Sequence, residues 1–154
     1  MKLLTINFDK AHRQMMDTSL TIEQLERDIW KAPGKDVSAL IVNVYKARKK
    51  LLAHLSVEDL RLLISQGIGL KYTIPLAIEL LKFNVLAEGD HYEGDLLLSV
   101  LRVDHHYWAN NIEDSQSLRI IYTDNIDLIE QFDTTDEIKR EIVSAYTKHL
   151  KSTA

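Results

Sequence analysis

Residues 55–108 contain the clearest structural signals in this chain and read LSVEDLRLLISQGIGLKYTIPLAIELLKFNVLAEGDHYEGDLLLSVLRVDHHYW. Three apolar runs with helical spacing lie in this stretch, and turns that contain glycine separate them. Between the second and third runs, residues 88–95 form a loop with four acids, no lysine or arginine, and two aromatic side chains. A helical scaffold that displays one charged loop is typical of a binding protein, and no familiar spacing of catalytic groups occurs here.

The length and composition of the chain favour one domain over residues 1–154. A chain of this length buries roughly two-thirds of its surface on folding, so it needs no covalent staple. It contains no cysteine, which excludes disulfides, a thiol nucleophile and every metal site built on cysteine. No stretch has the length of a signal peptide's apolar region or of a membrane helix, so we expect a cytoplasmic protein without membrane contact.

Signals for helix starts recur along the chain and predict an all-α fold. Thr21 and Ser56 each precede an apolar run, and Gln24 and Asp59 follow three residues later, as in a capping box. Pro75 suits the first turn of a further, strongly apolar helix, which we expect to be central and buried. The prediction is a single-domain bundle of about six to seven helices, over residues 21–30, 37–52, 56–67, 75–86, 96–103, 118–132 and 134–150.

Finer expectations concern the ends of these helices and the N-terminus of the chain. Gly67 suits the left-handed residue that follows a helix, and Asp95 suits the cap of the helix over 96–103. Thr134 with Glu137 predicts a third capping box. Residues 1–17 are ambiguous, since residues 2–8 could form a short strand while the following apolar residues could form a helical face.

Charge is distributed unevenly along the chain, although the net charge is only −4. Residues 1–54 carry a balance of +4, and residues 55–154 carry a balance of −8. An acidic surface attracts a basic partner and speeds the encounter, whereas phosphate recognition needs a concentrated basic patch. The sequence therefore disfavours direct binding of nucleic acid. An ordinary solvated surface is the alternative to an acidic docking face.

Few residues occur in a pattern that carries chemistry. Residues 67–71 have the wrong spacing for a phosphate-binding loop and follow a helix instead of a strand, and no GxSxG motif is present. His91 and His105 lie among acids, so a folded loop could bring them together around a metal ion. No HExxH motif supports a zinc site, and the neighbours His105 and His106 would point about 100° apart on a helix. We therefore expect no bound metal and no cofactor.

The loop at residues 88–95 is the best candidate for a binding site, because tyrosine offers a large contact area beside exposed acids. The segment at residues 104–108 follows one helix later and could lie beside this loop. Turn, cap and core roles are the structural alternatives for several of these residues. The candidate binding residues are Asp90, His91, Tyr92, Glu93, Asp95, Asp104, His105, Tyr107 and Trp108. A secondary acidic face is predicted from Asp124, Asp127 and Glu130.

Three strings in order resemble the immunity proteins of bacterial contact-dependent growth inhibition (CDI) systems. They are LTIEQLERDIW (20–30), LSVEDLRLLISQGIGLKYTIPLAIELL (55–81) and LAEGDHYEGDLLLSVLRVDHHYW (86–108). The resemblance implies a small helical cytoplasmic protein, without enzymatic activity, that binds and blocks the C-terminal toxin domain of its cognate effector. Such toxins are commonly nucleases, several of which act on transfer RNA, and in some relatives the toxin also engages elongation factor Tu. Contact residues are not implied, because each immunity protein is matched to one toxin.

Two other classes of function stay open on the sequence alone. One is a small metal-dependent hydrolase that uses His91, Asp95 and His105 with neighbouring acids. The other is a helical adaptor protein without a toxin partner. Both classes are compatible with the composition, and the metal content of the purified protein distinguishes the first of them.

Overall fold

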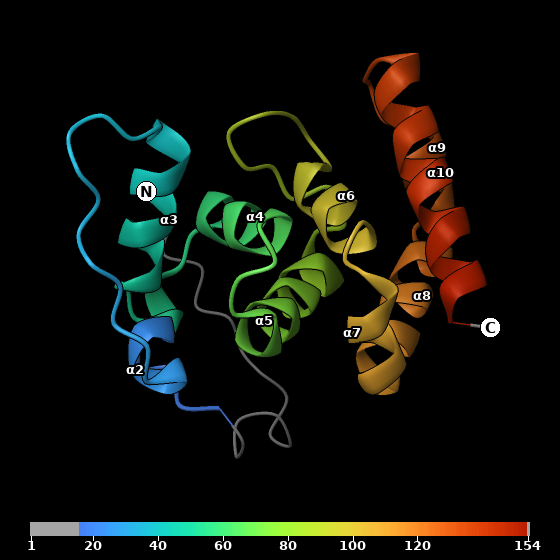
Figure 1. Cartoon of the computed structure of the whole chain (residues 1–154). Helices are drawn as coiled ribbons and strands as arrows, with labels where there is room; N and C mark the ends of the chain where they lie inside the picture. Colours follow the sequence, from blue (N-terminus) through green and yellow to red (C-terminus); the bar gives the residue numbers. More distant parts are fainter. Residues whose placement is uncertain (1–15, 154) are drawn as a thin grey trace.

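The computed structural model describes residues 16–153, and these residues form nine α-helices and one 3₁₀ helix (Figure 1). The helices are α2 (Ile22–Glu26), α3 (Ala39–Arg48), the 3₁₀ helix η1 (Leu52–His54), α4 (Val57–Ser65), α5 (Leu70–Phe83), α6 (Asp95–Leu101), α7 (His105–Asn110), α8 (Ile112–Asp124), α9 (Ile126–Gln131) and α10 (Asp136–Ser152). Extended pairing in this part of the chain is limited to two isolated bridges. The predicted all-α fold is confirmed. The strand considered for residues 2–8 lies outside the described residues.

The centre of the core consists of α4, α5 and α6. Helix α4 packs against both α5 and α6, and α10 packs against α6. Figure 1 shows α2 and α3 on one side of this centre and α7 to α10 on the other. Aliphatic side chains of α5 and α6 are buried around most of each helix, so the expected central, apolar helix is confirmed. Within residues 16–153, no helix combines the length and the hydrophobicity that crossing a bilayer requires.

Local capping chemistry starts α2 and α4 as predicted. The Gln24 amide donates to the Thr21 hydroxyl (3.1 Å), and the Thr21 amide donates to the Gln24 side chain (2.9 Å). Ser56 and Asp59 make the same reciprocal pair, with both distances 3.0 Å. Two of the amides that a helix start leaves unpaired are therefore satisfied at each of these helices.

Helix α2 is shorter than predicted, because it ends at Glu26 and not at Trp30. Arg27 adopts a left-handed conformation (φ 53°) and turns the chain away from the helix axis. The chain then wraps around the buried guanidinium of Arg48, which accounts for the early end: Arg48 Nη2 donates to the carbonyl of Asp28 (2.9 Å). This contact is distant in sequence, so helical periodicity could not predict it.

The turn between α4 and α5 contains one confirmed prediction and one correction. Gly67 is left-handed (φ 67°) after α4, and its amide donates to Ile64 O (3.0 Å), as expected for a helix C-terminus. Helix α5, however, begins at Leu70, so Pro75 lies in its second turn and not in the first. Proline has no N–H, so the helical hydrogen bond to the Lys71 carbonyl is absent at Pro75.

Three helices near the C-terminus differ from the prediction. Helix α7 was not expected; Asp104 starts it by accepting the amide of His106 (2.8 Å). The single helix expected over 118–132 is two helices, α8 and α9, which meet at Asn125. The Asn125 side chain donates to the Ile121 carbonyl (2.8 Å) in place of a backbone amide, and such competition ends a helix. Together, α7 and this break raise the helix count above six to seven.

Helix α10 begins one residue later than expected. Its cap is Thr135, whose hydroxyl accepts the amide of Ile138 (3.2 Å), and not Thr134. The third residue of the helix is therefore Ile138, so the expected capping box with Glu137 does not form. Adjacent threonines offer the same capping hydroxyl, so the sequence pattern alone does not distinguish Thr134 from Thr135.

A buried histidine joins the helices of the C-terminal half. His149 of α10 packs edge-on against Trp108 (ring centroids 4.9 Å apart), and its Nε2 atom lies 3.1 Å from Ser115 Oγ. Its Nδ1 atom is buried and has no partner among residues 16–153. The protonated ring carries an N–H on both nitrogens, so its Nδ1–H would be buried without an acceptor among these residues. Burial, followed by the charge of Arg119, lowers the pKa of His149.

We predict that acidification destabilises the fold through His149. In the unfolded chain this imidazole takes up a proton near pH 6.5, whereas in the folded chain its pKa is lower. The free energy of unfolding therefore falls as the pH drops below about 7, and His149 does not change it at higher pH. One such group contributes a slope of at most about 1.4 kcal/mol per pH unit. Urea unfolding between pH 8 and pH 5 measures the slope. It should be shallower in His149→Gln and unchanged in the control His105→Gln, whose side chain is exposed.

Candidate functional site

Residues 88–94, which we call the acidic loop, are held from within by the carboxylate of Asp95. Its Oδ1 accepts the amide of Gly89 (2.7 Å), and its Oδ2 accepts the amides of His91 (3.1 Å) and Tyr92 (3.4 Å). Asp95 is only 3% exposed. A buried carboxylate that accepts several backbone amides fixes the path of the chain around it.

A second carboxylate, that of Glu58 in α4, also holds the backbone of the acidic loop. Glu58 Oε2 accepts the amide of Asp90 (2.8 Å), and both Glu58 oxygens bind Arg61 at 2.7 and 2.6 Å. The hydrogen bonds from Arg61 hold the pKa of Glu58 below its usual value, and Glu58 in turn raises the pKa of Arg61. Arg61 Nε also lies 3.9 Å from Asp95, so one arginine links the two supporting carboxylates.

This support leaves the side chains of the acidic loop free to face solvent. Glu88, Asp90, His91 and Glu93 are exposed. Tyr92 is partly buried against the core, and this burial raises the pKa of its hydroxyl. Acids therefore point outward from a backbone whose conformation is fixed before any partner arrives, which lowers the entropy lost on binding.

Two of the predicted binding residues lie in the interior. Asp95 is the first residue of α6 and not its cap, which is the left-handed Gly94 (φ 87°), and it organises the acidic loop from inside. Trp108 is 1% exposed and donates from Nε1 to the carbonyl of Val103 (3.1 Å). These side chains support the structure, so the candidate surface rests on the exposed residues around them.

Tyr107 also has an internal partner. Its hydroxyl donates to Asp114 Oδ2 (2.8 Å), and burial together with the charge of Asp114 raises its pKa. The hydroxyl therefore serves to join α7 to the start of α8. Tyr107 is only partly buried, and its ring packs against the core.

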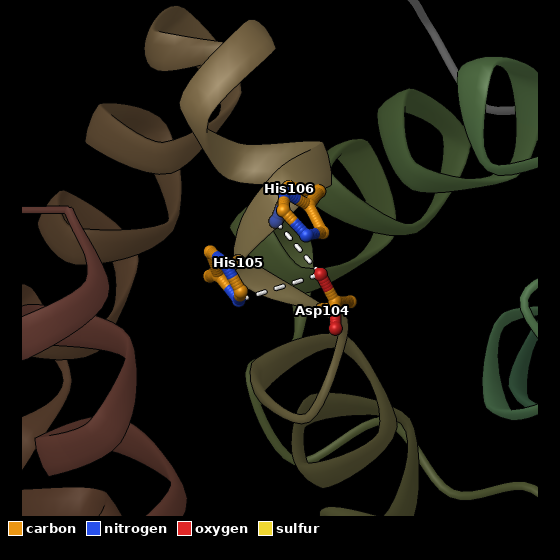
Figure 2. Close-up of side chains that lie close together, drawn as sticks. All are labelled: Asp104, His105 and His106. Carbon is orange, nitrogen blue, oxygen red and sulfur yellow. Dashed lines mark hydrogen bonds and ion pairs between the residues drawn. The ribbon is translucent and has the colours of Figure 1, made fainter.

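Figure 2 shows Asp104 with His105 and His106 at the start of α7. Asp104 Oδ1 lies 3.5 Å from His105 Nδ1, and the two imidazole rings lie 4.0 Å apart between centroids. Neighbouring side chains on a helix point about 100° apart, so we expected the two rings to be well separated, but they lie close together. In the part of the chain that the structure describes, these three exposed residues are the one group of histidines and acids close enough to share an ion.

The two predicted segments are not side by side. The acidic loop precedes α6 and Asp104 follows it, so they lie at opposite ends of a seven-residue helix. This separation also removes the basis for a hydrolase built on His91, Asp95 and His105. The carboxylate of Asp95 is buried and occupied by backbone amides, and His91 is not part of the group around His105.

The predicted secondary acidic face occurs at the junction of α8 and α9. Asp124 is the last residue of α8, and Asp127 and Glu130 belong to α9; all three side chains are exposed. Asp127 and Glu130 are three residues apart, so they share one face of α9. The fold therefore presents two acidic surfaces: the acidic loop, which lies between α5 and α6, and the face at the junction of α8 and α9.

The supporting residues were missed by sequence reasoning. Glu58 and Arg61 are three residues apart on α4, which signals an ion pair, but no local pattern reveals that their partner is a loop 32 residues later. The sequence places Gly89 in the loop at residues 88–95 and indicates no particular role for it. A Cβ atom at Gly89 would collide with Glu58 Oε2 and lie 3.0 Å from Asp95 Oδ2, so a side chain at this position would force the Glu58 carboxylate to shift.

We predict that Gly89→Ala disturbs the acidic loop. The added methyl group forces the two supporting carboxylates away from the amides they accept, with a loss of about 1–3 kcal/mol in the free energy of unfolding. Urea unfolding measures this loss, and amide exchange at residues 89–92 should speed up. Gly34→Ala is the matched control, since a Cβ atom at Gly34 meets nothing within 4 Å. Equal stability of the two variants would contradict the prediction.

Comparison with known proteins identifies one family. The chain matches the family model described as CDI immunity proteins over residues 24–118. No curated protein and no solved structure matches it. The matched range contains all three strings that carried the sequence resemblance except the first residues of the earliest one, and it contains the acidic loop with both of its supporting carboxylates. Because this match covers more than half of the chain, the protein belongs to the family of CDI immunity proteins.

Proposed function

We propose that this protein binds the C-terminal toxin domain of its cognate CDI effector in a 1:1 complex and blocks it without catalysis. The observation that carries the proposal is the acidic loop, whose exposed side chains are displayed on a backbone held by Asp95 and Glu58. Family membership supports toxin neutralisation as the purpose of such a surface. Asp90, His91, Tyr92 and Glu93 form the proposed contact surface.

We further propose that the toxin is a nuclease, directed in the most specific form of this proposal at transfer RNA. A nuclease binds phosphates and so presents basic side chains, and acids on an inhibitor can occupy the same groove. Elongation factor Tu would be reached only through the toxin. The site of action is the cytoplasm, where a delivered nuclease meets its substrate. No cofactor, direct nucleic-acid contact or membrane contact is part of the mechanism.

Co-expression tests the proposal directly. Cells that express the toxin domain encoded beside this gene should stop growing, and growth should resume when this protein is produced with it. An unrelated immunity protein is the control, because protection is specific to the cognate pair. Failure of the wild-type protein to restore growth would overturn the proposed function.

Charge reversal separates the two acidic surfaces. We predict that Asp90→Lys combined with Glu93→Lys slows association with the toxin domain about tenfold or more at low salt, and that association becomes less sensitive to salt. The matched control is Asp124→Lys combined with Asp127→Lys, which changes the net charge equally on the secondary face. Rapid-mixing kinetics measure both. Equal slowing by the two pairs would mean that only total charge matters, and not the acidic loop.

A further inference from the structure

A cavity of about 430 Å³ opens at the foot of the acidic loop, between α4 and α6. His91 and Tyr92 form its loop side. Arg61 and Ser65 come from α4, and Ser99 and Arg102 come from α6. The cavity thus adjoins the proposed contact surface and is large enough for one side chain of a partner.

The acceptor groups around this cavity are already occupied. The Asp95 carboxylate accepts three backbone amides, and Glu58 accepts one amide and both bonds from Arg61. The hydroxyl protons of Ser65 and Ser99 go to the carbonyls of Leu62 (2.8 Å) and Asp95 (2.9 Å), respectively. A ligand that only donates hydrogen bonds would therefore find few carboxylate lone pairs to bind.

Donor groups, by contrast, are available. Arg61 uses Nε and Nη2 for Glu58, and its Nη1 makes no hydrogen bond with residues 16–153. The Tyr92 hydroxyl likewise has no hydrogen-bond partner in that part of the chain. Arg102 is 55% exposed and lies 3.5 Å from Glu141, a distance at the limit of a hydrogen bond. Its guanidinium is therefore loosely held and can turn to a new acceptor.

We propose that this cavity receives an aspartate or glutamate side chain of the toxin domain, with Arg102 as its main partner. This inference rests on the proposed function and assigns the chemistry of one contact within it. A carboxylate matches the free donors, and a guanidinium can bind it through two parallel hydrogen bonds. The bound carboxylate would become shielded from water between α4 and α6, so the pair would be stronger than an exposed one.

Such a contact would add specificity that acids alone do not give. Any basic nuclease is attracted to an acidic loop, whereas only a toxin with a carboxylate at the right distance from its basic residues can fill the cavity. A toxin without that carboxylate would bring no acceptor to Arg61 Nη1 or to the loosely held Arg102 on binding. Specificity of this kind depends on a mixed charge pattern and not on net charge.

The test is the affinity of the purified toxin domain for Arg102→Glu, measured by titration calorimetry. We expect about tenfold weaker binding. The direction of the change in affinity is informative, because Arg102→Glu makes an acidic protein more acidic. If net charge alone mattered, this substitution would strengthen binding to a basic toxin. Arg140→Glu is the matched control, because Arg140 is an exposed arginine on α10 that does not line the cavity. Its affinity should stay equal to that of the wild type or increase.

A second variant tests the cavity by its volume. Ser65 is exposed at the end of α4, so Ser65→Trp places an indole over the opening, and it should also weaken binding about tenfold. Urea unfolding and circular dichroism verify that each variant folds. If Arg102→Glu binds as Arg140→Glu does, or Ser65→Trp binds like the wild type, this inference is wrong and the proposed function stands. Absence of binding by the wild-type protein would overturn the proposed function itself.

Discussion

Replacement of Asp95 by alanine should lower the free energy of unfolding by about 3–5 kcal/mol. The substitution leaves three backbone amides of the acidic loop without their acceptor and removes one of the two carboxylates beside Arg61. Because Asp95 is 3% exposed, water replaces the lost carboxylate only if the loop opens. We therefore expect both a less stable protein and a disordered loop.

Equilibrium unfolding in urea measures the stability of this variant, and amide exchange at residues 89–92 reports on the loop. Asp95→Asn keeps one acceptor oxygen but points an amide group at a backbone N–H, so it should recover only a small part of the loss. Asp90→Ala is the control, since its side chain is exposed and it should change stability by less than about 0.5 kcal/mol. A loss below about 1 kcal/mol in Asp95→Ala would mean that the loop keeps its shape without the carboxylate.

The second large effect is expected at Arg48, whose side chain is fully buried. Nη2 donates to Glu26 Oε2 (3.1 Å) and to the Asp28 carbonyl (2.9 Å), and the guanidinium carbon lies 4.0 Å from the centre of the Trp30 ring. Nε and Nη1 are buried without a partner among residues 16–153. The residue is therefore well packed but incompletely hydrogen-bonded.

We predict losses of different size for two substitutions at this position. Arg48→Ala leaves a cavity and an unpaired Glu26, and should lower the free energy of unfolding by about 2–4 kcal/mol. Arg48→Met keeps most of the packed volume and removes the two unpaired donors, so its stability should lie within about 1 kcal/mol of the wild type. The midpoints of urea unfolding compare the stability of these two variants with that of the wild type. Lys49→Ala, which removes the neighbouring exposed ion pair with Glu23, should change little. Equal losses in both Arg48 variants would show that the charge, and not the volume, stabilises this region.

Local chemistry was sufficient to predict the starts of α2 and α4 and the end of α4. Thr21 and Ser56 make the capping boxes that their spacing indicates, and Gly67 ends α4 in the predicted conformation. These interactions join residues within one or two turns, so the sequence contains both partners side by side. The all-α class and the buried centre follow from the same short-range patterns.

Long-range contacts account for what the sequence did not predict. The end of α2 depends on Arg48, which lies 20 residues from Asp28, and the shape of the acidic loop depends on Glu58, which lies 32 residues from Asp90. Asp95 was predicted to cap the helix over 96–103 and to belong to the binding surface, whereas its carboxylate is buried beneath the acidic loop. Whether an acid points outward or accepts amides from within depends on a packing partner that periodicity does not reveal.

Function, in turn, could be predicted from the sequence only through resemblance. No cluster of residues has a catalytic spacing, and the strings that carry the resemblance include helix caps, turns and the acidic loop. The family match supports that reading over most of the same range. Membership of the family does not determine which residues contact a toxin. The proposed contact residues follow from their exposed side chains and from the hydrogen bonds that hold the loop backbone beneath them.

The manner in which the acidic loop is held has a consequence for how this protein can change over evolutionary time. Both carboxylates that define the loop bind its backbone amides and not its side chains. The outward residues at positions 90, 91 and 93 can therefore mutate while the loop keeps its shape, whereas Glu58, Gly89 and Asp95 cannot. A new toxin variant could be met by point mutations at these outward positions alone, without loss of the fold on which immunity depends.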